Sequence, residues 1–82
     1  MPVHNSEIAD ILNRTADLLE LQGENVFRIR AYRNAARTVR SFSKSAAELV
    51  SEKADLSQYP GIGKALAGKI TNIVKTGSFD VL

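Results

Sequence analysis

The chain has 82 residues, a formal net charge of +2, no Cys and no Trp. This length suits one small domain and excludes the catalytic core of a polymerase, a kinase or a dehydrogenase. The lack of Cys excludes a disulfide scaffold and a thiolate zinc site, and no apolar run approaches the roughly 18 to 20 residues of a membrane span. The first seven residues lack a signal-peptide pattern.

Charge is distributed unevenly along the chain. Residues 1–27 carry one Arg against five acids, a net −4, whereas residues 28–45 carry five Arg and one Lys without any acid, a net +6. Residues 46–82 carry four basic and four acidic residues. A block of six like charges indicates either a solvated face or a surface that contacts a polyanion such as nucleic acid.

The first two predicted elements are helices over residues 6–22 and 26–41. The first has apolar residues at helical spacing, and Gly23 follows it where a left-handed residue would end a helix. Asn25 is the predicted N-cap of the second helix. The apolar arc of this second helix is formed by Ile29, Ala31, Tyr32, Ala35, Ala36, Val39 and Phe42.

Basic side chains occupy two different positions on the second predicted helix. Arg28 falls on the apolar arc, one turn before Tyr32, so the two side chains are i, i+4 neighbours. The other arginines fall opposite the arc and indicate either a second phosphate track or a soluble face. They are Arg30, Arg33, Arg37 and Arg40.

Three shorter helices are predicted in the rest of the chain. A Ser-x-x-Glu capping box opens one over residues 45–52, another is expected over 55–58, and the last covers 63–76 before Gly77. No strand-length alternation and no repeat is present. The pattern therefore predicts an all-α fold, a compact bundle of four to five short helices that forms a single domain over residues 1–82.

A hairpin between the last two helices is the most specific local feature. Pro60 fixes its own φ, and Gly61 and Gly63 permit conformations and close approaches that a Cβ would block. Free amides at the start of the next helix then point outward together, and with the helix dipole they suit a phosphate oxygen. A tight turn without a ligand is the alternative interpretation.

The residues around this hairpin resemble the helix-hairpin-helix DNA-binding motif, which we place over residues 54–77. Leu56, the run Tyr59-Pro60-Gly61-Ile62-Gly63, Ala67 and Ile70 carry the likeness, with Tyr59 where the motif usually has Leu. In that motif the hairpin amides hold the sugar-phosphate backbone whatever the base sequence. The amides that match are those of Gly61, Ile62, Gly63, Lys64 and Ala65.

A longer stretch also resembles a known family. The run from Gly23 to Arg37, GENVFRIRAYRNAAR, looks like the N-terminal domain of family X DNA polymerases of the bacterial and archaeal branch. It is more distantly similar to the small lyase domain of DNA polymerase beta. The likeness implies a domain that binds the downstream 5′-phosphate of a DNA gap and tethers a polymerase core in base excision or gap-filling repair.

The same resemblance implies roles for individual residues. Arg28 stands in the place of a phosphate-binding Lys, and Tyr32 stands in that of a pocket Tyr. A guanidinium grips a phosphate bidentately, so Arg28 keeps the anion-binding function. Lys69 matches the lysine that forms a Schiff base with the sugar C1′, so 5′-deoxyribose-phosphate lyase activity is an alternative to binding alone. Partial burial near other cations would favour the required neutral amine.

Two positions depart from the lyase pattern. Ala65 replaces a second phosphate-pocket Lys, and Gly68 replaces an acidic residue beside the nucleophile. Lys64 is one position from Ala65 and is a further candidate for phosphate contact. The carbonyls of a neighbouring loop match one that holds a monovalent cation when DNA is bound, namely those of Ser57, Tyr59 and Ile62.

The resemblance implies no other cofactor within this domain, and Mg²⁺ is expected only in a polymerase core. The expected partners are gapped, 5′-phosphorylated DNA and the remainder of a longer polymerase, and no membrane is expected to be bound. The domain is expected to be a monomer that lies in the cytoplasm, at the nucleoid. A helical protein-interaction domain is the remaining alternative. His4 lacks a metal-ligand partner, and the acids in and just after the first helix are interpreted as a solvated face. They are Glu7, Asp10, Asp17, Glu20 and Glu24.

Overall fold

The computed structural model describes residues 4–76, and all regular secondary structure in that range is helical. The elements are α1 (Asn5–Leu21), α2 (Val26–Arg40), α3 (Ala46–Ser51), the 3-10 helix η1 (Leu56–Gln58) and α4 (Lys64–Thr76). The all-α prediction is confirmed, and each helix begins and ends within one residue of its predicted bounds. The predicted stop at Gly77 lies outside the described residues.

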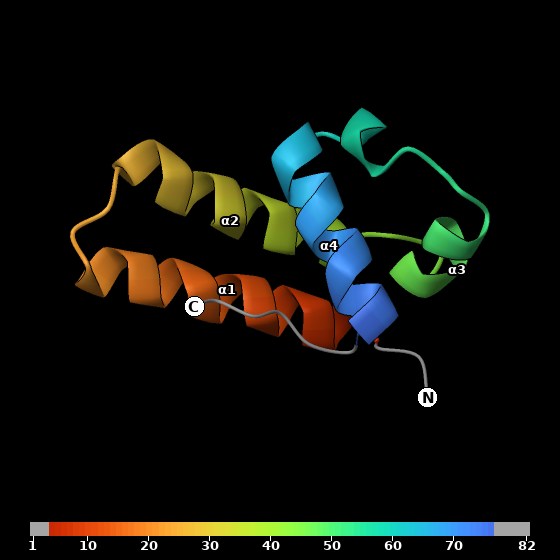
Figure 1. Ribbon diagram of the computed structural model, residues 1–82, viewed down its shortest axis with the longest axis horizontal. Coiled ribbons are helices and arrows are strands. Elements are labelled where there is room, and N and C mark those ends of the chain that lie inside the picture. The colour runs from red at the N-terminus through yellow and green to blue at the C-terminus, as the bar shows by residue number, and fades with distance from the viewer. Residues whose placement is uncertain (1–3, 77–82) are drawn as a thin grey trace.

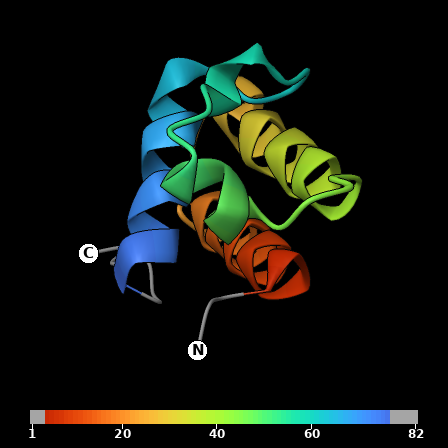
Figure 2. The ribbon, with the colours of Figure 1, turned by 90° about the vertical axis from the view of Figure 1, so that its right-hand side faces the viewer.

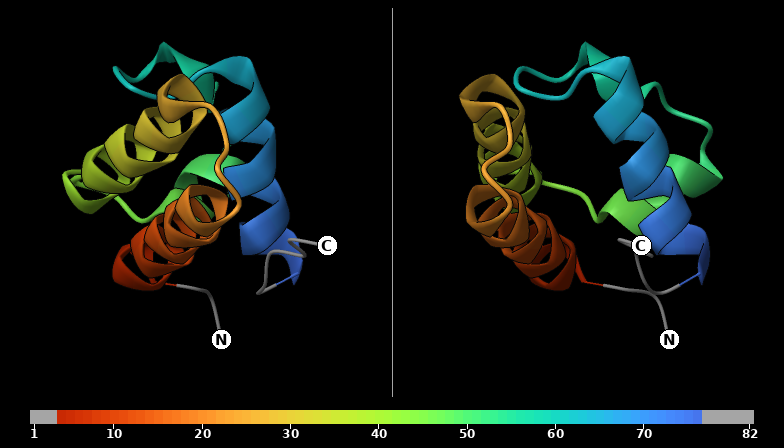
Figure 3. Two further views of the ribbon diagram at one scale, coloured as in Figure 1. Left: turned by 90° about the vertical axis from the view of Figure 1, so that its left-hand side faces the viewer. Right: turned by 60° about the vertical axis from the view of Figure 1, so that its left-hand side comes forward.

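The helices α1 and α2 form an antiparallel pair joined by a short turn (Figure 1). Helix α4 stands beside this pair and contacts α1, α3 and η1, as the rotated views show (Figures 2 and 3). Aliphatic side chains from α1, α2 and α4 meet between the helices. Those that are almost completely buried and largest are Ile8, Leu12, Val39, Ile70 and Ile73.

The turn between α1 and α2 is fixed by backbone conformation and by a cap. Gly23 has a φ of +71°, the left-handed conformation that commonly ends a helix. The Asn25 side chain accepts a hydrogen bond from the Phe27 amide at 2.7 Å, which confirms Asn25 as the N-cap of α2. This turn sets the position of Arg28, which lies in the first turn of α2.

Ion pairs join the solvent-facing sides of α1 and α2. Arg33 Nη2 lies 3.0 Å from Asp17 Oδ1 and 2.8 Å from Glu20 Oε1, and Arg40 Nη2 lies 2.6 Å from Asp10 Oδ1. Hydrogen bonding to Asp17 raises the pKa of Arg33 further above its ordinary high value. The acids of α1 are exposed as predicted, but three of them face arginines of α2 instead of solvent alone.

The hairpin is held against α2 at two points. Thr38 Oγ1 donates a hydrogen bond of 2.7 Å to the Pro60 carbonyl. Gly61 has a φ of +85°, and a Cβ built there would lie 2.9 Å from Thr38 Oγ1 and 3.4 Å from the Asn34 carbonyl oxygen. A Cβ at this position would force the Thr38 hydroxyl to move, and the positive φ strains residues other than glycine. The closing of the hairpin therefore fixes where its amides stand relative to α2.

Candidate nucleic-acid interface

A pocket of about 450 Å³ opens between α2 and the hairpin. Arg28, Ala31 and Tyr32 line it from α2. The hairpin and α4 contribute Gly61, Gly63, Ala65, Leu66 and Lys69. The fold thus brings together three predicted phosphate-pocket residues that are separated by up to 41 positions in the sequence: Arg28, Tyr32 and Lys69.

The pocket is basic and partly apolar. None of its lining residues is acidic, and two of them, Arg28 and Lys69, are cationic. The Arg28 side chain is 53% exposed and lies 3.7 Å from Glu24, a distance and exposure at which an ion pair is weak. Tyr32 is 4% exposed and forms a rigid wall. The pocket therefore combines two cationic side chains with a buried aromatic wall.

The hairpin amides are not equivalent. The Ile62 amide donates to the Tyr59 carbonyl at 3.1 Å, so it is engaged within the turn. Within residues 4–76 the amides of Gly61, Gly63, Lys64 and Ala65 donate to no other group. Four of the five predicted amides are therefore available to a ligand, and the Ile62 side chain is instead a buried anchor, 3% exposed.

Lys64 does not line the pocket, although the sequence made it a candidate. It lies near Asp55, the N-cap of η1. Hydrogen bonds from the Ser57 hydroxyl and amide hold the pKa of Asp55 below its usual range, and the charge of Lys64 makes a smaller contribution in the same direction. Ala65 lines the pocket without adding a charge, so the pocket has one cation fewer than the lyase pattern has.

The four outer arginines of α2 separate into two pairs. Arg33 and Arg40 bind acids of α1, as described above. The side chains of Arg30 and Arg37 are exposed and form neither an ion pair nor a hydrogen bond within the described range. The sequence alone treated these four residues as one group.

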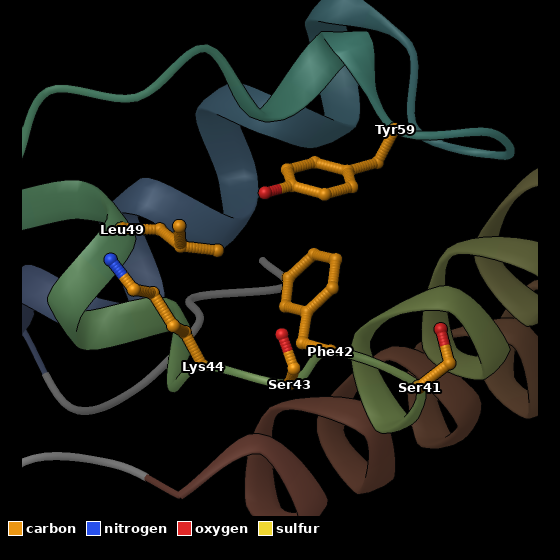
Figure 4. Close-up of a pocket in the computed structure, with 6 residues that line it drawn as sticks. All are labelled: Ser41, Phe42, Ser43, Lys44, Leu49 and Tyr59. Carbon is orange, nitrogen blue, oxygen red and sulfur yellow. The ribbon is translucent and has the colours of Figure 1, made fainter.

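Two features of the structure were not predicted from the sequence. A hollow of about 230 Å³ lies beyond the C-terminal end of α2, where the Phe42 and Tyr59 rings pack 4.6 Å apart between centroids (Figure 4). Lys44 at its edge bonds to Glu52 at 3.0 Å, which raises the pKa of Lys44 and engages its charge. The second feature is Phe27, which precedes Arg28 and is 74% exposed. Its position next to an arginine in the sequence could have indicated this exposed ring.

Residues 4–76 contain neither a candidate membrane span nor a candidate metal site. No helix in that range is long and apolar enough to cross a membrane. The same residues contain no group of three or more His, Asp or Glu side chains placed to hold a metal ion. The pocket between α2 and the hairpin therefore remains the principal candidate site of the described chain.

Comparison with known proteins agrees with this architecture. A family model described as a helix-hairpin-helix domain matches residues 3–79. The chain is also 30% identical over 80 residues to the N-terminal region of the "DNA polymerase/3'-5' exonuclease PolX" of Bacillus subtilis (strain 168). The match covers 98% of this chain and 13% of that relative. The predicted resemblance is confirmed, and the chain belongs to the helix-hairpin-helix domain family.

Proposed function

We propose that this domain binds gapped DNA through the downstream 5′-phosphate and the adjoining sugar-phosphate backbone, as part of a longer family X repair polymerase. The observation that carries the proposal is the convergence of Arg28, Tyr32 and Lys69 with the hairpin glycines around one pocket. Its volume of about 450 Å³ falls within the ~300–1,000 Å³ of typical ligand sites, enough for a phosphate with its deoxyribose.

The charges explain why an end is preferred over the middle of a strand. A terminal phosphate monoester carries about −1.5 to −2 charges at neutral pH, against −1 for an internal diester. Two cations in a pocket without an acid favour the more highly charged group. In this arrangement Arg28 binds two phosphate oxygens, the free amides at Gly61 and Gly63 bind the backbone, and the Tyr32 ring packs against the sugar.

The hairpin carbonyls fit the monovalent cation that the family resemblance implies. Within the described residues the carbonyls of Ser57 and Ile62 accept no backbone hydrogen bond, whereas that of Tyr59 accepts one, from Ile62. A carbonyl oxygen has two lone pairs, so all three retain capacity for a hard cation. We propose that these three carbonyls hold such an ion only when DNA brings its phosphates to the hairpin.

The proposal is tested by comparing two gapped duplexes that differ only in a phosphate or a hydroxyl at the downstream 5′ end. We expect the phosphorylated gap to bind at least about tenfold more tightly, since charge-assisted hydrogen bonds contribute roughly 1.5–3 kcal/mol. Fluorescence anisotropy at several salt concentrations measures both affinities. Equal affinities would contradict the pocket, and a domain that contacts only protein would bind neither duplex.

Lyase activity is a second candidate function, favoured by the position of Lys69 in the same pocket. Its neutral amine would add to C1′ of the ring-opened deoxyribose, and loss of water would give a Schiff base. Borohydride reduction of the domain on 5′-deoxyribose-phosphate DNA should then leave a covalent adduct. The Lys69→Arg variant keeps the positive charge and should give no covalent adduct. If the wild-type domain is not trapped, the pocket binds without catalysing elimination.

A further inference from the structure

We infer that the outer side of α2 is a second DNA-contacting surface, which binds the backbone of the duplex that follows the 5′-phosphate. Arg30, Asn34 and Arg37 form this surface, and we name it the α2 ridge. The inference rests on the proposed function, because it assumes that the 5′ end is held in the pocket. It adds a surface outside that pocket and separates two of the four outer arginines from the other two.

Ion pairing determines which arginines belong to the ridge. Helix α2 has five arginines and no acid. Arg33 and Arg40 each lie within 3.0 Å of a carboxylate of α1, which offsets part of their positive charge. Arg30 and Arg37 have no such partner within residues 4–76. The uncompensated positive charge on the outer side of α2 is therefore at these two residues.

The ridge is continuous with the hairpin. Positions 30, 34 and 37 follow i, i+4 and i+7 spacing, so they share one face of α2. On the helical wheel Asn34 lies between the two arginines and Thr38, which bonds the hairpin. The same Asn34 carries the carbonyl oxygen 3.4 Å from the Cβ position of Gly61. A strand that passes the hairpin amides would thus meet Asn34 next and then the arginines.

The spacing of the charges suits a phosphate backbone. Seven residues of α-helix extend about 10.5 Å, at a rise of about 1.5 Å per residue. One DNA strand carries a phosphate per ~3.4 Å of duplex axis, so the two arginines span about three phosphates. Arg side chains and a neutral amide between them are typical of contacts that position a duplex without reading its sequence. This charge complementarity favours DNA over an apolar protein partner.

The test compares two double variants that remove the same charge. Arg30→Gln with Arg37→Gln removes the ridge, and Arg33→Gln with Arg40→Gln removes the ion-paired arginines. Binding to phosphorylated gapped DNA is measured from low to high salt. We expect the ridge variant to weaken binding and to reduce the slope of log affinity against log salt by about 1.8, close to 0.9 per lost phosphate contact. The control should leave the slope nearly unchanged.

The outcomes separate this inference from the proposed function. The ridge variant should keep the wild-type ratio of affinities for phosphorylated and unphosphorylated gaps, because the pocket is intact. Equal slopes for the two double variants, or an unaltered slope for the ridge variant, would overturn the ridge even if that ratio is large. If the control loses its circular dichroism signal, Lys53→Gln with Lys75→Gln replaces it as the charge-matched variant.

Discussion

Arg28→Ala should abolish the preference of the domain for a phosphorylated gap and leave its binding to the unphosphorylated gap nearly unchanged. The change removes the side chain that can bind two phosphate oxygens, and the loss of such charge-assisted bonds amounts to roughly 1.5–3 kcal/mol, or about 10- to 150-fold in affinity. Stability should hardly change, because the ion pair of Arg28 with Glu24 is exposed and 3.7 Å long. Anisotropy with both gaps measures the ratio.

Two variants make this result interpretable. Arg14→Ala removes an exposed arginine of α1 that does not line the pocket, so it should reduce affinity for both gaps equally and slightly. Arg28→Lys keeps the charge but not the planar fork, and should retain part of the preference. A full preference in Arg28→Ala would show that Lys69 and the amides suffice, and would remove Arg28 from the proposed site.

Gly61→Ala should both destabilise the domain and weaken its binding to any DNA end. The left-handed φ of +85° and the 2.9 Å approach of the new Cβ to Thr38 Oγ1 act together. Backbone strain costs about 1–2 kcal/mol, and loss of the hydrogen bond from Thr38 Oγ1 to the Pro60 carbonyl costs about 1 kcal/mol. The free energy of unfolding should therefore fall by roughly 2–3 kcal/mol. For a domain of this size that lowers the melting temperature by on the order of 10–20 °C. Thermal denaturation measures the first effect, and anisotropy below the transition measures the second.

Gly63→Ala is the matched control for that substitution. Gly63 does not have a positive φ, and no atom lies within 4 Å of an added Cβ. The sequence indicated that both glycines are needed by the backbone, but the free protein needs only Gly61. Gly63→Ala should therefore melt like wild type while binding DNA more weakly, because a methyl group would stand where the backbone of DNA approaches. Wild-type affinity would show that DNA does not approach Gly63 closely.

The sequence alone allowed us to predict the helices and much of the pocket lining. Local signals defined the helices: apolar periodicity, the Asn25 cap and the capping residue Ser45, whose side chain accepts from the Glu48 amide at 3.1 Å. Arg28 and Tyr32 could be paired because i, i+4 neighbours on one helix need no tertiary information. Lys69 joined them only through the family resemblance, since no local rule relates positions 41 residues apart.

The remaining features depend on how elements meet, which the sequence does not determine by local rules. Arg33 reaches Asp17 and Glu20 because of the register between α1 and α2. A helical wheel drawn for α2 alone does not distinguish the arginines that pair with α1 from those that do not. In the same way, the engaged Ile62 amide follows from the geometry of a turn that the pattern of Pro and Gly indicates but does not specify.

The pocket is assembled from two stretches of chain, residues 28–32 and 61–69, with α3 and η1 between them. A molecule bound there touches both stretches at once, and the unfolded chain cannot offer that combination. Occupation therefore acts as a removable cross-link, with a stabilisation that grows by about 1.4 kcal/mol for each tenfold rise in ligand above its dissociation constant. While it is loaded, the domain gains resistance to unfolding in proportion to how tightly it holds its ligand.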